Sequence, residues 1–415
     1  MRVLVVGGGG REHAICWSLN KSPRVTKLYC APGNGGISEF AQCVNISATD
    51  IDAMVSFAKD NADFVMVAPD DPLALGMVDA MESAEIRAFG PHKAAAKLES
   101  SKAYAKNIME QYGIPTAKHE KFTDVDKAKA YIKEQGAPIV VKADGLALGK
   151  GVVVAYDVQT ALNAVDWLLV DRTFGDSGNC VVIEECMTGP EVTILAFTDG
   201  KTIVPMISSQ DHKRALTGDH GPNTGGMGAF CPSPLYTKEL AEICMEKIFK
   251  PTIEAMNGEG IPFKGVLYFG LMLTSNGPRV IEYNARFGDP ETQPILSLLK
   301  TDLFEIFDAI VDERLHEIEI EWNEGSACCV VIASGGYPEK YQTGYEINGL
   351  NKVPADIAVF HAGTKKSGDT LVTNGGRVLG ITATGSTLSQ AVERAYEGVS
   401  HINFKDAYYR TDIGR

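Results

Sequence analysis

The sequence has no C-x-x-C pair, and only two of its nine cysteines, Cys328 and Cys329, are adjacent. This pattern gives neither a recognisable zinc site nor a disulfide framework, and it favours reduced thiols in the cytoplasm. No apolar run approaches the roughly 20 residues that a membrane-spanning helix needs. Met1 leads directly into a strand predicted at residues 2–6, so we expect no signal or transit peptide.

Basic residues are outnumbered, because 39 Lys and Arg stand against 53 Asp and Glu for a net charge of −14. Such a chain is a poor general binder of nucleic acids or anionic membranes, although a local basic pocket for a phosphorylated metabolite stays open. Hydrophobic content of 45% and charged content of 22% are typical of a soluble globular protein. A length of 415 residues predicts roughly two to four domains.

The dinucleotide-binding fingerprint G-x-G-x-x-G is also missing. The first predicted strand runs into four glycines at residues 7–10, but the third glycine position falls on Glu12 or His13. The ribose-binding acid expected at the end of the second predicted strand is also missing, since that strand ends with the uncharged residues 29–32. NAD binding, and with it an NAD-dependent oxidoreductase, is therefore not expected. The turn suits the phosphate of a smaller ligand, and tight strand–helix packing alone is the alternative.

Apolar patterning divides the chain into successive parts. Up to about residue 100, short strands alternate with helices, which predicts a parallel α/β sheet. Further strands follow, with a helix at about 158–170 and a hairpin turning at residues 199–200. A polar segment at about 209–229 resembles one long loop, and loops of this length inside compact domains are usually functional or disordered. Strands and a helix at residues 389–399 then predict a further α/β domain.

The most informative segment is residues 279–291. Asn276-Gly277 between two apolar runs predicts a hairpin, and on the returning strand alternate side chains share one face. We therefore expect Glu282, Asn284 and Arg286 to point the same way. The opposite face is expected to carry the apolar residues of the strand, Ile281, Tyr283 and Ala285. A carboxylate and an amide oxygen suit Mg²⁺, and a guanidinium suits a carboxylate or phosphate. Taken alone, the pattern equally fits an exposed strand face.

A glycine-rich turn at residues 142–151 carries a lysine near each end, Lys142 and Lys150. It is not a P-loop, since Asp144 stands where the first glycine belongs and Gly151 replaces the Ser or Thr. Glycines let backbone approach a phosphate and lysines neutralise its charge, whereas a flexible surface hairpin is the alternative. The acidic residues at 184–191 suit the binding of a nucleotide. The cations and glycines at 208–228 suit a lid over its phosphates.

Taken in order, these motifs resemble the ATP-grasp ligases and, more narrowly, the phosphoribosylamine–glycine ligase (glycinamide ribonucleotide synthetase) family. The resemblance covers essentially the whole chain. It rests on Gly-Gly-Arg-Glu-His (9–13), Ala-Pro-Gly-Asn (31–34), Lys-Ala-Asp-Gly (142–145), Gly-Lys-Gly (149–151), Gln-Asp-His-Lys-Arg (210–214), Gly-Pro-Asn-Thr-Gly-Gly-Met-Gly (221–228), Asn-Ala-Arg-Phe-Gly-Asp-Pro-Glu-Thr-Gln (284–293), Phe-His-Ala-Gly-Thr (360–364) and Thr-Asn-Gly-Gly-Arg-Val (373–378).

The resemblance implies an α/β fold in three domains. An N-terminal parallel α/β (pre-ATP-grasp) domain is expected at residues 1–103, on the substrate side. A two-lobed ATP-grasp α+β core is expected at 104–324, with a mobile lid lobe at about 118–190. A small C-terminal α/β domain is expected at 325–415.

The activity implied is the ATP-dependent ligation of glycine to 5-phosphoribosylamine in purine biosynthesis, through a glycyl phosphate, giving glycinamide ribonucleotide, ADP and phosphate. The alternative is another ATP-grasp carboxylate–amine ligase. A catalytically silent nucleotide-binding regulator is a rival of another class, but it predicts the loss of metal ligands or loop lysines that this chain keeps. The implied protein is a cytoplasmic monomer that uses Mg²⁺ or Mn²⁺ and binds these small molecules, with no nucleic acid and no membrane.

The resemblance also implies roles for individual residues. The metal ligands are Glu282 and Asn284. The residues around ATP are Lys102, Lys142, Gly149, Lys150, Gly151, Glu184, Glu185, Glu191, Arg214 and Asn223. The substrate side comprises Gly9, Gly10, Arg11, Glu12, Asp70, Gly225, Gly226 and Asp289. The catalytic set is Arg286, Lys213 and Asp211. The chain departs from the family in two places: Asp70 stands where glutamate is usual, and residues 270–273 offer no second acidic metal ligand, so one ion or two stays open.

Overall fold

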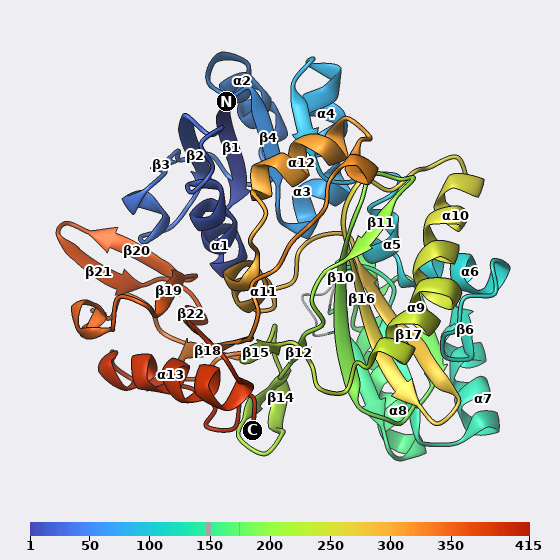
Figure 1. Cartoon of the computed structure of the whole chain (residues 1–415). Helices are drawn as coiled ribbons and strands as arrows, with labels where there is room; N and C mark the ends of the chain where they lie inside the picture. Colours follow the sequence, from blue (N-terminus) through green and yellow to red (C-terminus); the bar gives the residue numbers. More distant parts are fainter. Residues whose placement is uncertain (147–150, 174) are drawn as a thin grey trace.

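The computed structural model of the chain describes residues 1–146, 151–173 and 175–415. Figure 1 shows the N-terminal part at the upper left, the C-terminal part at the lower left and the central part on the right. Among the described residues, no helix is both long and apolar enough to cross a membrane.

The N-terminal part is a parallel five-stranded sheet of order β3-β2-β1-β4-β5. Its strands are β1 (Arg2–Gly7), β2 (Lys27–Pro32), β3 (Gln42–Cys43), β4 (Phe64–Val67) and β5 (Arg87–Phe89). Its helices are α1 (Gly10–Leu19), α2 (Ile51–Asn61), α3 (Asp70–Leu75) and α4 (Met77–Ser83). Helices α3 and α4 are separate because Gly76, with φ of +97°, ends α3 in a left-handed conformation. The predicted parallel α/β sheet is confirmed.

Helix α12 (Leu303–Val311), which follows the central part in sequence, packs on this sheet (Figure 1). Phe304 meets Phe64 edge-on with ring centroids 5.2 Å apart, and Phe307 stacks on Phe89 at 4.0 Å. These apolar contacts join the N-terminal sheet to the segment that leaves the central part.

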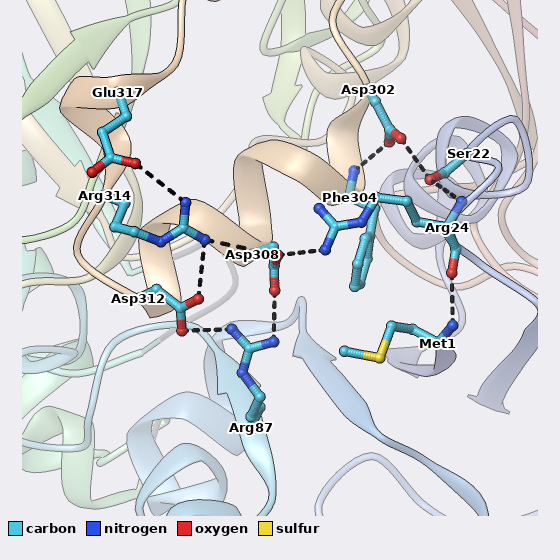
Figure 2. Close-up of polar contacts among 10 residues, drawn as sticks. All are labelled: Met1, Ser22, Arg24, Arg87, Asp302, Phe304, Asp308, Asp312, Arg314 and Glu317. Atoms are coloured by element: carbon cyan, nitrogen blue, oxygen red, sulfur yellow. Dashed lines mark hydrogen bonds and ion pairs between the residues drawn. The ribbon is translucent and has the colours of Figure 1, made fainter.

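Polar contacts surround the same helix (Figure 2). The Asp308 carboxylate accepts hydrogen bonds from Arg24 and Arg87, each at 2.6 Å, and Arg87 also donates to Asp312 at 2.6 Å. At the start of α12, the Asp302 carboxylate accepts the backbone N–H of Phe304 at 2.9 Å. The N-terminal sheet and α12 are therefore held together by both packing and ion pairs.

The first lobe of the central part is an antiparallel sheet of order β6-β9-β7-β8. Its strands are β6 (His119–Phe122), β7 (Ile139–Ala143), β8 (Val152–Ala155) and β9 (Val181–Glu185). Helices α7 (Val125–Gln135) and α8 (Val158–Val165) bury Ile132 and Val165 against Val141 and Ile183. The helix expected at 158–170 ends its α-helical part at Val165 and continues as a π-helical turn, Asp166–Val170.

The second lobe is an antiparallel sheet of order β11-β10-β16-β17. Its strands are β10 (Glu191–Thr198), β11 (Ile203–Pro205), β16 (Gly265–Thr274) and β17 (Gly277–Asn284), and both predicted hairpins are confirmed. The accompanying helices are α5 (Lys97–Ser100), α6 (Lys102–Gln111), α9 (Lys238–Cys244) and α10 (Lys250–Gly258).

The prediction of one long loop at 209–229 is wrong. This segment contains the strands β12 (Gln210–Asp211), β13 (Arg214–Leu216), β14 (His220–Asn223) and β15 (Gly228–Cys231). Strands β13 and β14 form a hairpin, whereas β15 pairs with β18 about a hundred residues later, Ala229 lying opposite Cys329. Strands this short, paired with distant partners, leave no local periodicity in the sequence.

The C-terminal sheet has the order β12-β15-β18-β22-β19, with β23 also on β18. Its own strands are β18 (Ser326–Ser334), β19 (Ala358–His361), β22 (Arg377–Gly385) and β23 (Ala407–Tyr408). A small hairpin, β20 (Thr364–Ser367) with β21 (Thr370–Thr373), and helices α11 (Thr292–Leu298) and α13 (Leu388–His401) complete this region. Because β12 and β15 belong to this sheet, the central and C-terminal parts are continuous.

Candidate active site

Glu282 and Asn284 lie at the end of β17. Glu282 is opposite Gly270 on β16, where an added Cβ would lie 3.2 Å from the Glu282 Cγ. Gly270, which has no side chain to act as a second acidic ligand, thus leaves the space that the Glu282 side chain occupies. A carboxylate and an amide oxygen form a donor set that suits Mg²⁺. Among the described residues, no group of three or more His, Cys, Asp or Glu could hold a metal ion.

The predicted alternation along β17 is wrong at Ile281. The register shifts at Leu271, and Ile281 becomes the extra residue of a β-bulge. Val280 and Tyr283 are buried, whereas Ile281 is only partly buried. The Ile281 carbonyl oxygen accepts a hydrogen bond from Lys142 Nζ at 3.3 Å, so the bulge connects β17 to the glycine-rich turn of the first lobe.

Lys213 lies among carboxylates immediately after β12. Its Nζ is 3.6 Å from Glu282 Oε1 and 3.3 Å from Glu191 Oε2. Burial opposes the lysine's charge, but Asp211, Glu191 and Glu282 outweigh it and raise the pKa of Lys213. Burial likewise disfavours ionisation of Glu282, but Lys213 and Lys142 outweigh it and lower its pKa. The lysine and Glu282 therefore both stay charged at neutral pH.

A second charged group joins α6 to the first lobe. Glu184 on β9 is buried and lies 2.9 Å from Lys142 Nζ and 3.2 Å from Lys106 Nζ. Burial alone would raise the pKa of Glu184, but the two ammonium groups lower it. Burial lowers the pKa of Lys106 to about 8. Lys102 donates to the Gly145 carbonyl at 3.0 Å, and burial lowers its pKa while nearby Glu282 opposes that change. Lys102, Lys142 and Glu184 thus lie close to one another.

Three more residues of the predicted ATP set are held in their own local contacts. Glu185 lies 2.7 Å from Arg279 Nη2 on β17. Arg214 and Asn223 are paired across the β13–β14 hairpin, and the Arg214 guanidinium donates to the Gly221 carbonyl at 2.9 Å. The structure therefore shows Arg214 in contacts within its own hairpin.

The glycine-rich turn is described only at its ends. Gly149 and Lys150 lie outside the described residues. The carbonyl oxygen of Gly151 accepts the backbone N–H of Ala143 at 2.8 Å.

Glu99, which sequence reasoning missed, contacts the last residue of β17 and the two residues that follow it. Its carboxylate lies 2.7 Å from Arg286 Nη2 and accepts the backbone N–H of Ala285 at 2.7 Å. The Asn284 amide is satisfied in the orientation in which Nδ2 donates to Glu99 Oε1 at 3.0 Å and to the Tyr283 carbonyl at 3.3 Å. Burial raises the pKa of Glu99 to about 7. No sequence signal marks this residue, because it is 186 positions before Ala285 in an unpatterned four-residue helix.

Arg286 keeps one donor free. Its Nη1 donates to the Phe287 carbonyl at 3.2 Å and its Nη2 contacts Glu99. Its buried Nε has no hydrogen-bond partner in the part of the chain that the structure describes. Burial opposes the charge of Arg286, but Glu99 and Asp70 outweigh it and raise its pKa. Asp70, at the start of α3, is therefore near this guanidinium, and an anion could occupy the free donor.

The helix start at Gly9–Glu12 differs from an open anion site. The Gly9 N–H donates to Glu12 Oε2 at 2.5 Å, so the helix is capped by its own carboxylate. Arg11 lies 2.7 Å from Glu12 Oε1 and donates to the Phe287 carbonyl at 3.1 Å. Gly10 permits close packing, since an added Cβ would lie 2.7 Å from Gln293 Nε2 on α11. This turn therefore lies against the segment that follows Arg286.

The remaining substrate-side residues are joined by Arg377 on β22, which sequence reasoning also missed. Its Nη1 donates to the Gly225 carbonyl at 2.8 Å and the Asp289 carbonyl at 2.6 Å, and its Nη2 lies 3.3 Å from Asp289 Oδ2. Gly226 has φ of +114°, and an added Cβ would collide with Pro290 Cδ. A residue of the C-terminal sheet thus connects Gly225 and Asp289, and Gly226 packs beside them.

Two acids lie near Lys213, the buried Glu291 and the partly buried Asp211. Burial raises the pKa of Asp211 on β12. Burial also raises the pKa of Glu291 to about 7, and the charge of Asp211 adds to that effect. Asp211 is therefore one of the charged neighbours of Lys213.

Two antiparallel lobes, with a carboxylate and an amide on one and lysines of the other turned toward them, define an ATP-grasp protein. The chain belongs to the phosphoribosylglycinamide synthetase family: the family's N domain matches residues 1–99, its ATP-grasp (A) domain matches 100–292 and its C domain matches 327–415. The predictions of family, α/β fold class and ATP-dependent ligase are confirmed.

Relatives that match the chain over its full length support the same family assignment. Phosphoribosylamine–glycine ligases of Halalkalibacterium halodurans and Caldanaerobacter subterraneus are each 48% identical, over 100% of this chain and 96% and 99% of theirs. The crystal structure of phosphoribosylamine–glycine ligase from Thermotoga maritima is 33% identical with a TM-score of 0.87, and each chain covers 100% of the other. A biotin carboxylase domain of Hydrogenobacter thermophilus in complex with MgADP, ADP and bicarbonate has a TM-score of 0.76 at 16% identity, covering 98% of this chain and 91% of its own, which shows the shared fold alone.

Proposed function

We propose that the chain ligates glycine to 5-phosphoribosylamine with cleavage of ATP to ADP and phosphate. The observation that carries the proposal is the meeting of three groups at the end of β17. Glu282 and Asn284 lie there, and Lys142 and Lys213 approach them from two other segments. The third group is Arg286, whose following segment lies against the substrate-side turn at residues 9–12.

The ATP phosphates lie between the two lobes in this proposal. Glu282 and Asn284 hold Mg²⁺ or Mn²⁺, which when bound neutralises phosphate charge and orients the transferred group. Lys142 approaches the phosphates from the first lobe and Lys102 from the start of α6. Lys150 and the glycines at 149 and 151 are assigned to the same phosphates. The acidic residues Glu184, Glu185 and Glu191 and the hairpin residues Arg214 and Asn223 surround the rest of the nucleotide.

Glycine is activated first. An oxygen of its carboxylate attacks the γ-phosphorus, the bond to the β-phosphate oxygen breaks, and ADP leaves. Phosphoryl transfer requires mainly positioning and charge neutralisation. The free Nε of Arg286 suits the glycine carboxylate, and Lys213, kept charged by its carboxylate neighbours, offsets the developing negative charge.

The amine reacts second. The nitrogen of 5-phosphoribosylamine attacks the carbonyl carbon of glycyl phosphate, loses a proton, and phosphate leaves with one of the glycine oxygens. The amine substrate lies against residues 9–12, Asp70, Gly225, Gly226 and Asp289. Arg377 and Arg11 hold this surface in place through backbone carbonyls, so it is formed before the substrate arrives.

Acyl phosphates hydrolyse readily, so the lobe at about 118–190 acts as a lid that excludes water. The domain boundaries at 103 and 324 belong to the same proposal, as do a monomeric state and a cytoplasmic location. All nine cysteines lie within the described residues and none forms a disulfide, which supports a reducing compartment.

The test is ADP release by the full chain with each substrate omitted in turn. We expect release at full rate only when ATP, glycine and 5-phosphoribosylamine are all present. Replacing glycine with alanine serves as the matched control and should give little release. Full release without 5-phosphoribosylamine, or with alanine as well as glycine, would instead indicate another carboxylate–amine ligase of this fold.

A further inference from the structure

Asn284 presents a geometric problem. The oxygen and nitrogen of an amide have nearly the same shape, yet only the oxygen can bind a cation. Rotation by half a turn would direct the NH₂ group at the ion. Something must therefore fix the orientation of this side chain before a metal ion and ATP bind.

Glu99 fits that requirement. It comes from α5 on the N-terminal side of the site, and its side chain is 7% exposed. Its Oε1 lies 3.0 Å from Asn284 Nδ2 in the satisfied orientation of the amide. Because a carboxylate only accepts hydrogen bonds, it selects the NH₂ group and turns the amide oxygen away from itself.

The same carboxylate fixes the backbone that carries Asn284. Glu99 Oε2 accepts the N–H of Ala285 at 2.7 Å, and Glu99 Oε1 lies 2.7 Å from Arg286 Nη2. One buried side chain thus contacts three consecutive residues: the amide ligand, the following peptide and the guanidinium with the free Nε. None of its contacts requires Glu99 to touch the nucleotide.

We propose that Glu99 is a positioning residue, which orients the Asn284 amide oxygen toward the metal ion and holds Arg286 beside it. This inference rests on the proposed metal site at Glu282 and Asn284. Removing outer partners of metal ligands typically weakens metal binding roughly tenfold to a hundredfold.

The test compares ADP affinity with and without Mn²⁺, measured by isothermal titration calorimetry on the full chain. The ratio of the two affinities is the metal-dependent gain. Glu99→Ala should reduce this gain roughly tenfold to a hundredfold while metal-free ADP affinity stays unchanged. Glu305→Ala, at an exposed glutamate of α12, is the matched control and should keep the full gain.

A second substitution separates orientation from simple structural support. Aspartate has two equivalent oxygens and needs no orientation, so Asn284→Asp in the Glu99→Ala background should restore most of the gain. In the wild-type background, Asn284→Asp places a second carboxylate against Glu99 and should reduce the gain. Failure of the double variant to recover would show that Glu99 only supports the fold. Where Glu99→Ala does not fold, Glu99→Gln keeps the shape and tests the same rescue.

Glu282→Ala distinguishes the inference from the metal site on which it rests. If Glu282→Ala abolishes the gain and Glu99→Ala leaves it intact, the positioning role is wrong and the metal site stands. If Glu282→Ala also leaves the gain intact, the proposed metal site itself is wrong.

Discussion

Among single residues, Glu282 carries the strongest prediction about activity. Its carboxylate has lysines on two sides and lies opposite a glycine that leaves it space. We expect Glu282→Ala to lower kcat/KM by roughly a hundredfold to a thousandfold, as for loss of one preorganised group that stabilises the transition state. The measurement is steady-state ADP release, with the thermal midpoint as a check of folding. A variant that retains wild-type activity would remove the metal role from this residue.

Glu184 carries a prediction about stability. It is buried with Lys106 and Lys142, so its removal leaves two buried ammonium groups without their partner. We expect Glu184→Ala to lower the free energy of unfolding by about 3–5 kcal/mol. The measurement is urea unfolding followed by fluorescence, for which Trp167 in the first lobe is a local probe.

The matched control is Glu246→Ala. Glu246 pairs with Lys250 at 2.5 Å on an exposed helical surface, and its loss should change the free energy of unfolding by less than about 0.5 kcal/mol. Equal effects of the two substitutions would contradict the burial argument.

At the scale of single residues, the sequence predicted which side chains lie together where the proposed ligands are close along the chain. Glu282 and Asn284 are two residues apart on one strand, so period two was enough to place them together. Glu99 and Arg377 were missed because their partners are far away in the sequence, and an isolated Glu or Arg has no pattern. Ile281 was misplaced because a β-bulge interrupts the period and nothing in the residue types announces it.

At the scale of elements, the Gly225–Gly226 turn provides the clearest test. Gly226 has φ of +114°, and a methyl group there would collide with Pro290. We expect Gly226→Ala to lower kcat/KM at least roughly tenfold, because the turn must move away from Asp289. Kinetics with 5-phosphoribosylamine varied should show the loss.

Gly260→Ala is the control for backbone strain without a clash. Gly260 also has positive φ, at +73°, but an added Cβ there would meet nothing within 4 Å. It should cost about 1 kcal/mol of stability and leave kcat/KM unchanged. Loss of activity in both variants would mean that the close approach to Pro290 is not the cause.

Elements with a strong local pattern were predicted and others were not. β1 is apolar from Val3 to Val6 and hairpin β16–β17 has Asn-Gly at its turn, so both could be placed from sequence. The segment at 209–229 was taken for one loop because its strands are two to four residues long and two of them belong to a sheet completed a hundred residues later.

At the scale of the whole molecule, the N-terminal and C-terminal parts meet through two buried histidines. His13 on α1 stacks on His361 of β19, and its Nδ1 accepts the backbone N–H of His361 at 2.9 Å. Burial lowers the pKa of His361 to about 4, and that of His13 well below its usual value. Both histidines are therefore neutral in the folded protein.

This contact predicts a pH dependence of stability. Between about pH 6.5, the ordinary histidine pKa, and about pH 4, the unfolded chain binds protons that the folded chain does not. The free energy of unfolding should therefore fall as the pH falls, by about 1.4 kcal/mol per unit for each histidine. Urea unfolding at pH 7 and pH 5 should show a smaller difference for His361→Gln than for the wild type. The two profiles should be parallel above pH 7, and equal slopes below it would contradict this account.

The order of the three parts was evident from motifs, but their connections were not. Packing of α12 on the N-terminal sheet and the sharing of one sheet by β15 and β18 are contacts between distant segments. Such contacts depend on tertiary structure, which a single sequence does not display.

Isotope transfer tests the central claim, phosphorylation of the glycine carboxylate, most directly. Glycine labelled with ¹⁸O at both carboxylate oxygens is converted with ATP and 5-phosphoribosylamine, and the released phosphate is examined by mass spectrometry. We predict one ¹⁸O atom in each phosphate, one retained in the amide product and none in ADP. Phosphate without ¹⁸O would contradict the account.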